Sequence, residues 1–290
     1  MHSGCTNGID TGFVALGYAK VAVLGVVQGI TELMPISSTA HMRILPALLG
    51  WTDPGSAFSA AMQLAALAAV ISYFWRDVWD IVSGSLSAIA RRDYYDRSFR
   101  LAVGIVIGTI PIGIAGLALA KTLNTCGSPL RSLVVVGLAC IVMALLLAIA
   151  EVAARHQRPF ECVGLLDCLV VGIGQVGALI PGVSRSGSTL TAALFLGFKR
   201  EEAARFSFLL GLPAIALAGL KELAELRHAG LDAHGWSVLT LGLVVASLSS
   251  FLAIWSLLRI LERYAAWPFV VYRAFVGALL LAGVATGWLG

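Results

Sequence analysis

Long apolar runs alternate with short polar segments along this chain. Most runs reach the length of about 17–25 residues that crosses the hydrocarbon core of a bilayer, and the fourth is shorter. They cover residues 57–75, 101–120, 132–150, 206–220, 237–258 and 268–289. Polar and apolar positions do not alternate within them as in barrel strands, so helices must satisfy the backbone hydrogen bonds in lipid. The pattern predicts an all-α polytopic membrane protein with about six transmembrane helices.

Two further apolar stretches, residues 12–50 and 163–198, are interrupted in the middle by glycine, proline and polar residues. Broken helices persist at membrane depth where they line a cavity walled by protein. We therefore predict that each stretch is a re-entrant helix pair, followed in each half by three spanning helices. Because an odd number of crossings turns the second half around, residues 1–290 are expected to form a single integral membrane domain of inverted repeats, over about 12–150 and 163–289.

The two interruptions resemble each other in sequence. Residues 28–39 align with residues 175–186, which places Gln28 on Gln175 and Ser37 on Ser184. Inverted repeats bring their broken segments together near the bilayer midplane, where such folds place a binding site. We expect one site, built from both interruptions.

The composition agrees with a membrane protein, because 59% of the residues are hydrophobic and 12% are charged, whereas soluble domains have about 45–50% and about 25%. The net charge of +4 could indicate a nucleic-acid partner, but the basic residues stand at the ends of apolar runs and form no stripe. This placement is typical of membrane topology. We predict contact with membrane lipids and no nucleic-acid partner.

Basic residues are distributed unequally between the two predicted sides. The side with the loop after the first spanning run has twelve of them, and the opposite side has four. The twelve are Arg76, Arg91, Arg92, Arg97, Arg100, Arg155, Arg158, Lys199, Arg200, Arg205, Arg259 and Arg263, and the four are Lys121, Arg131, Lys221 and Arg227. The positive-inside rule places the twelve in the cytoplasm and both termini outside it. The first apolar stretch has no basic segment before it, which argues against a cleaved signal peptide.

The five cysteines, Cys5, Cys126, Cys140, Cys162 and Cys168, have no zinc-type spacing. Cys140 and Cys168 lie inside apolar runs, where a cysteine acts as a small buried apolar residue. We expect no disulfide.

The first interruption has an acid at membrane depth. Gln28 and Glu32 are four residues apart and share one face of a helix. A carboxylate in lipid is costly unless it is paired, hydrogen-bonded or bound to a metal, so Glu32 is a functional candidate, with a structural role at a helix end as the alternative. The amide of Gln28 can bind substrate or simply form a hydrogen bond across helices.

The segment that follows is expected to start a second half-helix. Ser37 or Ser38 can cap it, and its first N–H groups, with Thr39 beside them, can bind an anion. His41 can transfer protons near neutral pH. Next to Ser38 and within reach of Glu32, His41 would complete a set of nucleophile, base and orienting group. A buried histidine with satisfied ring nitrogens is the alternative.

The second interruption contains Arg185, whose planar guanidinium has five donors that match phosphate oxygens. The hydroxyl groups of Ser184, Ser186 and Thr189 surround it as further donors. The alternative is an arginine that extends to the membrane interface. Together the interruptions offer two helix N-termini, an arginine and several hydroxyls, which suit a polyanionic headgroup such as a diphosphate. An apolar tail could leave sideways between helices into the bilayer.

Two segments of the chain form specific motifs. They are Gln28-x-x-x-Glu32 with Pro35-x-Ser37-Ser38-Thr39-x-His41, and Pro181-Gly182-x-Ser184-Arg185-Ser186-Gly187-x-Thr189. These motifs resemble those of the undecaprenyl-diphosphate phosphatase family, which is also known for bacitracin resistance. The resemblance extends over nearly the whole chain from about residue 18, with weaker matches at Gln63, residues 206–210 and Tyr272-Arg273.

The resemblance implies a hydrolase that removes the terminal phosphate from undecaprenyl diphosphate and regenerates the monophosphate carrier lipid of peptidoglycan synthesis. It also implies a multi-pass protein of the bacterial inner membrane, an active site that faces the periplasm, a divalent cation (Mg²⁺ or Ca²⁺) as cofactor, and a homodimer. The implied catalytic residues are Glu32, Ser38, His41 and Arg185, the implied substrate-binding residues are Gln28, Ser37, Thr39, Ser184, Ser186 and Thr189, and the implied metal ligand is Glu32. Gln28 stands where many members have the first of two acids, which puts a metal site of two carboxylates in question.

Two other functions compete with this one. Inverted repeats with broken helices are also a transporter architecture, so the chain could move a polyprenyl-phosphate lipid without hydrolysis. The pairing of Ser38 with His41 favours an enzyme. Another class of membrane lipid phosphatase has a Ser-Arg pair and a histidine six residues after the arginine, where this chain has Thr191. In a phosphatase, either Ser38 attacks phosphorus itself or His41 activates a water molecule, and the sequence leaves both open.

Overall fold

The computed structural model describes residues 12–124, 130, 132–228 and 230–288, and most of them are helical. The α-helices are α1 (Phe13–Leu33), α2 (Ser38–Leu49), α3 (Ser56–Ala61), α4 (Gln63–Tyr73), α5 (Trp75–Arg91), α6 (Arg97–Asn124), α7 (Leu133–Ala153), α8 (Leu165–Val176), α9 (Arg185–Phe195), α10 (Arg200–His228), α11 (Ala233–Tyr264) and α12 (Trp267–Ala285). Two 3₁₀ helices, η2 (Phe160–Cys162) and η3 (Gly177–Leu179), precede and follow α8. Within this described part, the only extended pairing is an isolated bridge between Arg158 and Phe198. The prediction of an all-α fold is confirmed.

Six of the described helices are long and apolar enough to cross a membrane, namely α1, α6, α7, α10, α11 and α12. The last five match the predicted runs from 101–120 onward, although α12 ends at Ala285, before the end of the run 268–289. The short run at 206–220 lies inside the longer helix α10, whose charged ends do not belong to the apolar run. The chain is therefore a multi-pass membrane protein, and five of the six predicted spans are among these candidates.

The first predicted run, residues 57–75, is not one straight span, which corrects the prediction. It forms α3 and α4, and at Phe74 the backbone leaves helical geometry (φ −99°, ψ 32°) and turns by 80° into α5. Helix α5 is amphipathic, with Trp79 exposed on one side and Asp77 paired with Arg205 of α10. This ion pair joins the start of α5 to α10.

The first predicted re-entrant pair consists of α1 and α2, although α1 alone is long enough to cross a membrane. The start of α1 and the chain after α2 lie together. The rings of Phe13 and Phe58 stack with centroids 4.8 Å apart, and the ammonium of Lys20 lies over the ring of Trp51. Gly17 (φ 71°) interrupts α1 near its start. Both ends of this segment are thus at the same end of the molecule, as a re-entrant pair requires.

The second predicted re-entrant pair consists of α8 and α9, and its two ends are tied together. The backbone N–H of Arg158, before α8, donates to the carbonyl oxygen of Gly197, after α9 (2.9 Å). The guanidinium of Arg158 also donates to both carboxylate oxygens of Asp167 in the first turn of α8 (2.9 and 2.7 Å). The segment therefore enters and leaves at one end of the molecule.

Helices from the two halves pack against each other through glycine. Helix α1 lies along α11, where a Cβ on Gly25 would be 2.9 Å from the carbonyl oxygen of Gly242. Helix α8 lies along α6, where a Cβ on Gly172 would be 2.1 Å from the carbonyl oxygen of Gly108. Small residues allow such close approach of membrane helices. In each contact, the first helix of one half packs against the corresponding later helix of the other half, as expected for two related halves. The opposite orientation of the two halves in the membrane stays a prediction.

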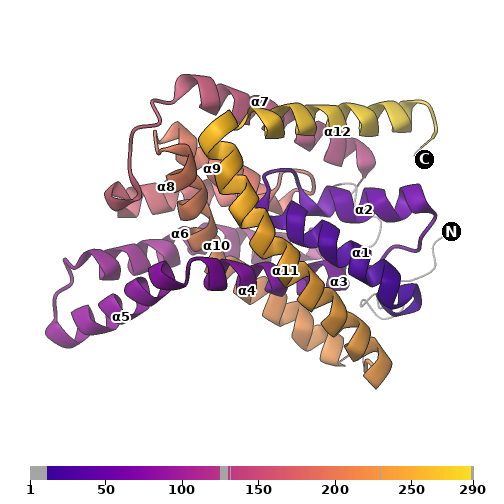
Figure 1. Cartoon of the computed structure of the whole chain (residues 1–290), viewed down its shortest axis with the longest axis horizontal. Helices are drawn as coiled ribbons and strands as arrows, with labels where there is room; N and C mark the ends of the chain where they lie inside the picture. The colour runs from indigo at the N-terminus through magenta and orange to yellow at the C-terminus, as the bar shows by residue number, and fades with distance from the viewer. Residues whose placement is uncertain (1–11, 125–129, 131, 229, 289–290) are drawn as a thin grey trace.

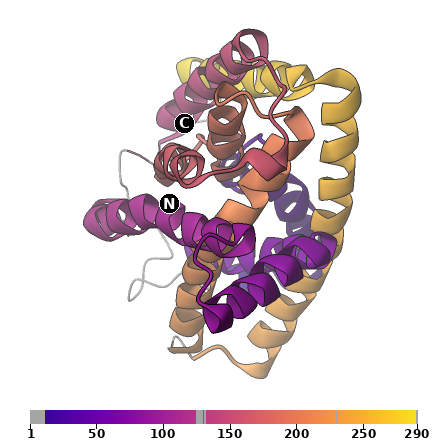
Figure 2. The ribbon, with the colours of Figure 1, turned by 90° about the vertical axis from the view of Figure 1, so that its left-hand side faces the viewer.

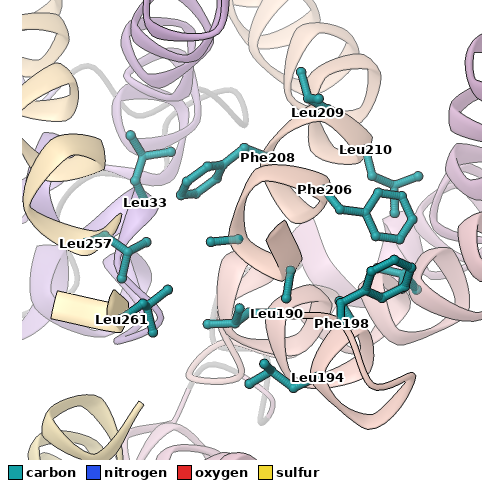
Figure 3. Close-up of a cluster of buried hydrophobic side chains, with 14 of the residues drawn as sticks. Leu33, Leu190, Leu194, Phe198, Phe206, Phe208, Leu209, Leu210, Leu257 and Leu261 are labelled. Atoms are coloured by element: carbon teal, nitrogen blue, oxygen red, sulfur yellow. The ribbon is translucent and has the colours of Figure 1, made fainter. Parts of the chain in front are cut away.

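The largest cluster of buried apolar side chains surrounds α9 and α10 and extends to α1 and α11. Figure 3 shows the rings of Phe198 and Phe206 beside each other, with centroids 5.6 Å apart. Leu190 comes from α9, and Leu33 and Leu257 come from α1 and α11. This cluster holds α9 between the two halves, so that its first residues lie at the centre of the molecule.

Several of the predicted cytoplasmic arginines form ion pairs that join neighbouring helices. Arg205 joins α10 to Asp77 of α5, and Arg200 joins α10 to Glu151 of α7. In Figure 1 the connection between α5 and α6 is at the left, and the start of α1 and the end of α12 are at the right. Figure 2 views the molecule from the left-hand end. Arg131 and both chain termini lie outside the described residues, so their side of the membrane stays a prediction.

Single cysteines test the predicted topology in a variant whose five native cysteines are replaced. Of these five, Cys140, Cys162 and Cys168 are free thiols in the structure, and Cys5 and Cys126 lie outside the described part of the chain. Thr52 after α2, Tyr95 between α5 and α6, and Thr286 after α12 are all exposed.

In spheroplasts, we expect a membrane-impermeant maleimide to label Thr52→Cys and Thr286→Cys. Tyr95→Cys should be labelled only after the membrane is permeabilised, because arginines flank it on both sides. Labelling of Tyr95→Cys and Thr286→Cys from the same side would contradict the inverted repeat.

Candidate active site

Each interruption ends in a serine with a positive φ angle, Ser37 (73°) and Ser184 (71°), directly before α2 and α9. Residues other than glycine rarely adopt this conformation, and it is strained. Its occurrence at the two aligned serines supports the internal repeat. Ser184 Oγ caps α9 by accepting from the backbone N–H of Gly187 (3.2 Å), whereas Ser37 Oγ makes no cap bond and lies 3.1 Å from Thr39 Oγ1.

The two interruptions are in direct contact, as the inverted repeat predicts. The hydroxyl of Ser186, in the first turn of α9, lies 3.1 Å from the carbonyl oxygens of both Glu32 and Met34 at the end of α1. This contact joins residues 152 and 154 positions apart in the sequence. The candidate functional groups of both interruptions therefore belong to one site.

Arg273 of α12 joins the interruptions a second time, and only 1% of it is exposed. Its Nη1 donates to the carbonyl oxygen of Pro35 (2.9 Å). Its Nη2 donates to the carbonyl oxygens of Gly182 and Val183 (2.8 and 2.9 Å). In the sequence, Arg273 is only a weak match to the family, although an arginine inside an apolar run itself indicates a functional residue.

Glu32 is the acceptor at the centre of the site, and only 5% of it is exposed. Its Oε2 accepts hydrogen bonds from Gln28 Nε2 (3.0 Å) and Ser38 Oγ (2.7 Å). Its Oε1 accepts from Nη2 of Arg185 (3.4 Å), which makes a buried ion pair between the interruptions. Helices α1, α2 and α9 thus converge on one carboxylate, and Ser38 has a proton acceptor within hydrogen-bond distance.

Arg185 points inward and does not extend to the membrane interface, since its side chain is only 10% exposed. Gly211 of α10 leaves room for the guanidinium, because a Cβ there would lie 1.9 Å from Nη1. Among the residues that the structure describes, Nε and Nη1 of Arg185 have no hydrogen-bond partner. Buried donors are normally bonded, so these two N–H groups are suited to the oxygens of a phosphate.

The three hydroxyls predicted around Arg185 are used elsewhere. Thr189 Oγ1 donates to the backbone carbonyl of Arg185 (2.8 Å), Ser186 contacts the end of α1, and Ser184 caps α9. Ser186 and Thr189 donate to backbone carbonyls because a buried hydroxyl must find an acceptor, whereas Ser184 accepts a bond and keeps its own O–H to donate. The roles of Ser184, Ser186 and Thr189 as phosphate donors stay a prediction.

His41 does not pair with Ser38, which corrects a second prediction. Its Nδ1 lies 2.7 Å from the carbonyl oxygen of Ser37, and its Nε2 lies 2.6 Å from the hydroxyl of Tyr272 on α12. The predicted set of nucleophile, base and orienting group is not formed, and Glu32 takes the place beside Ser38. Residues three apart share a helix face only roughly, because a turn has about 3.6 residues, and Tyr272 holds the ring on the other side.

A cavity of about 130 Å³, whose lining includes several polar side chains, lies beside Ser38. From the first interruption, Gln28, Ser38 and Thr39 line it, and Ser59 of α3 and Gln63 of α4 line it from the other side. In the sequence, Gln63 is only a weak match to the family, and no role was predicted for Ser59. The available signal was a polar side chain inside a predicted spanning run, where polar groups are costly.

A divalent cation would find oxygen ligands here but no complete cage. Among the described residues, no three of His, Cys, Asp and Glu gather as a metal site. Gln28 Oε1, next to Glu32, is a buried acceptor that has no partner in the described part of the chain. Mg²⁺ is usually held by one or two carboxylates together with substrate phosphates. Glu32 and Gln28 therefore fit a cation that shares its ligands with a phosphate.

The chain is similar to a known protein family and to several named proteins. Residues 21–279 match the family described as "Bacitracin resistance protein BacA". A protein of Mesorhizobium japonicum named "Undecaprenyl-diphosphatase 2" is 72% identical over 262 residues, which are 90% of this chain and 99% of the relative. Proteins named "Undecaprenyl-diphosphatase" from Gloeobacter violaceus and Synechococcus elongatus are 52% and 50% identical over 274 and 271 residues, which are 94% and 93% of this chain and 94% of each relative.

The match to the family includes both interruptions, every residue placed around Glu32, and Arg273. It also includes most of the helices on which these residues lie. The chain therefore belongs to the BacA family of bacitracin resistance proteins.

Proposed function

We propose that this protein is a membrane phosphatase that hydrolyses undecaprenyl diphosphate to undecaprenyl phosphate and inorganic phosphate, and so regenerates the carrier lipid of peptidoglycan precursors. The observation that carries the proposal is the 2.7 Å contact between Ser38 Oγ and the Glu32 carboxylate, with Arg185 on the other oxygen of that carboxylate. In this proposal Ser38 is the nucleophile, Glu32 is the proton acceptor and Arg185 binds the phosphate, and the contacts among the three support these roles. The names of the relatives support the same activity.

We further propose that the protein resides in the bacterial inner membrane, with the site open to the periplasm, and that it forms a homodimer. The unequal distribution of basic residues supports the orientation. The homodimer rests on the family resemblance alone.

In the proposed reaction, Ser38 Oγ attacks the terminal phosphorus and gives its proton to Glu32. A bond forms between the serine oxygen and phosphorus, and the bond from phosphorus to the bridging oxygen breaks, so undecaprenyl phosphate leaves with the electron pair. Water then attacks the phosphorus of the phosphoserine, the bond from phosphorus to the serine oxygen breaks, and that oxygen takes the proton back from Glu32 as inorganic phosphate is released. Once Glu32 has the proton, it holds Arg185 less strongly, and the guanidinium is free to stabilise charge on the transferring phosphoryl group.

Glu32 and Gln28 Oε1 would hold the divalent cation of this family, Mg²⁺ or Ca²⁺, beside the phosphates. The cation would offset the negative charge of the diphosphate. Ser38 donates to the same carboxylate, so the serine, the arginine and the cation would all meet at Glu32.

Phosphate release by the purified protein tests the proposed function. We expect release from undecaprenyl diphosphate and from shorter prenyl diphosphates, and a lower rate after chelation of divalent cations. Transfer of a non-hydrolysable lipid diphosphate across vesicle membranes, with no phosphate release from the natural lipid, would contradict hydrolysis and favour a transporter.

The same assay separates the two routes to the terminal phosphorus. Ser38→Ala should leave almost no activity if the serine is the nucleophile, whereas loss of a single hydrogen-bond donor costs about 10²–10³-fold. Residual turnover in that smaller range, with no phosphoserine trapped in the unmodified protein, would reject the covalent route and leave attack by water.

Substitutions of the buried acid and its amide neighbour separate their roles. Glu32→Gln should lower kcat by at least about 10²-fold, because Ser38 loses its proton acceptor. Gln28→Ala should cost less, and Gln28→Glu should be tolerated, because a second carboxylate strengthens cation binding. The measurement is kcat and KM over a range of Mg²⁺ concentrations, with thermal unfolding as the control for folding. A greater loss in Gln28→Ala than in Glu32→Gln would show that the two roles are exchanged.

A further inference from the structure

Two neighbouring residues of α12, Tyr272 and Arg273, contact the interruptions although they belong to neither. Arg273 donates to backbone carbonyls in both. Tyr272 reaches the first turns of α2, where its hydroxyl lies 2.6 Å from His41 Nε2. The two rings also stack, with centroids 5.6 Å apart and planes at 9°. Stacking and the hydrogen bond together fix the orientation of the imidazole.

Both ring nitrogens of His41 are in use. The carbonyl oxygen of Ser37 can only accept, so Nδ1 carries the hydrogen of the 2.7 Å contact. In the neutral imidazole, Nε2 is then the acceptor, and this assignment from the network makes the hydroxyl of Tyr272 the donor. Neither nitrogen is left to take a proton from Ser38, which donates to Glu32.

The bond from His41 to Ser37 supports a strained turn. The backbone N–H of His41 lies 3.4 Å from the carbonyl oxygen of Ser37, so the first ordinary hydrogen bond of α2 is long. Nδ1 of the same residue donates to that oxygen at 2.7 Å. It thereby holds the peptide that joins Ser37, with its positive φ of 73°, to Ser38. The direction of the Ser38 hydroxyl follows from the orientation of this peptide.

We propose that His41 and Tyr272 are positioning residues for the proposed phosphatase reaction. Tyr272 orients His41, His41 holds the carbonyl of Ser37, and the hydroxyl of Ser38 is thereby aimed at its carboxylate partner. On this account, His41 matters because of the hydrogen bond that it donates, and it does not titrate during turnover. The role rests on the proposed phosphatase function.

Two substitutions of His41 distinguish a positioning residue from a general base. The amide of His41→Asn can still donate to the carbonyl of Ser37, and His41→Ala cannot. We expect kcat of His41→Asn to stay within about tenfold of the unmodified protein and to exceed that of His41→Ala by at least about tenfold, with KM changed less than about threefold in both. Loss of a general base would instead cost about 10²–10⁴-fold in both variants.

Tyr272→Phe keeps the stacked ring and removes only the hydroxyl. We expect kcat to fall by about threefold to tenfold. Combination with His41→Asn should add no further loss, because the hydroxyl then has no imidazole to orient. The matched control is Tyr264→Phe, which removes an exposed hydroxyl at the end of α11 and should leave the activity unchanged.

Two further readouts complete the experiment. The pH profile of kcat/KM should keep its shape in His41→Asn. In a Ser38→Cys variant, the thiol at position 38 reports the position of that residue by its rate of reaction with a small thiol reagent. We expect the same rate whether residue 41 is unchanged or carries His41→Asn, and a different rate when it carries His41→Ala. The reporter tests the position of residue 38 separately from the proposed function, because it needs no phosphate release.

Four results would overturn this role of His41 and Tyr272. They are equally large losses in His41→Asn and His41→Ala, a missing limb of the pH profile in His41→Asn, a normal kcat in Tyr272→Phe, and equal reporter rates in all three backgrounds.

Discussion

Backbone carbonyls at membrane depth must find donors within the protein, because lipid offers none. The two interruptions leave such carbonyls at Pro35 in one and at Gly182 and Val183 in the other, and the guanidinium of Arg273 donates to all three. One side chain of α12 therefore ties the two broken helix pairs together. The hydroxyl of Ser186 adds a second tie by donating to the end of α1. The position of every group around Glu32 depends on these contacts.

The site itself follows from the same need of buried polar groups for partners within the protein. A buried carboxylate without partners would be costly, and breaking a buried pair leaves an uncompensated charge. Glu32 has donors from three helices, and one of them is the cation Arg185. The arrangement that makes a buried Glu32 tolerable also places Ser38 and Arg185 on the two oxygens of its carboxylate, where the proposed reaction needs them. Stability of the fold and chemistry of the site therefore share one set of contacts.

Length and hydrophobicity were enough to predict most of the helices, because a lipid-facing helix must be long and apolar. Glycine and proline in residues 12–50 and 163–198 were enough to predict the broken pairs. The bend at Phe74 could not be predicted from hydrophobicity, and the helix after it is joined by Asp77 to Arg205, 128 positions away. The orientation of His41 depends in the same way on Tyr272, 231 positions away. Local spacing identified the residues of the site, and contacts between distant segments determined which of them face each other.

If the interruptions meet through Glu32 and Arg185, the two residues must be energetically coupled. A double-mutant cycle measures this coupling as the free energy of unfolding in mixed micelles for Glu32→Gln, Arg185→Gln and the double variant. Removal of one partner of a buried pair costs about 3–5 kcal/mol. The double variant leaves no unpaired charge, so it should lose at least about 1 kcal/mol less than the sum of the single losses. Losses that add to within about 0.5 kcal/mol would contradict the pairing on which the site depends.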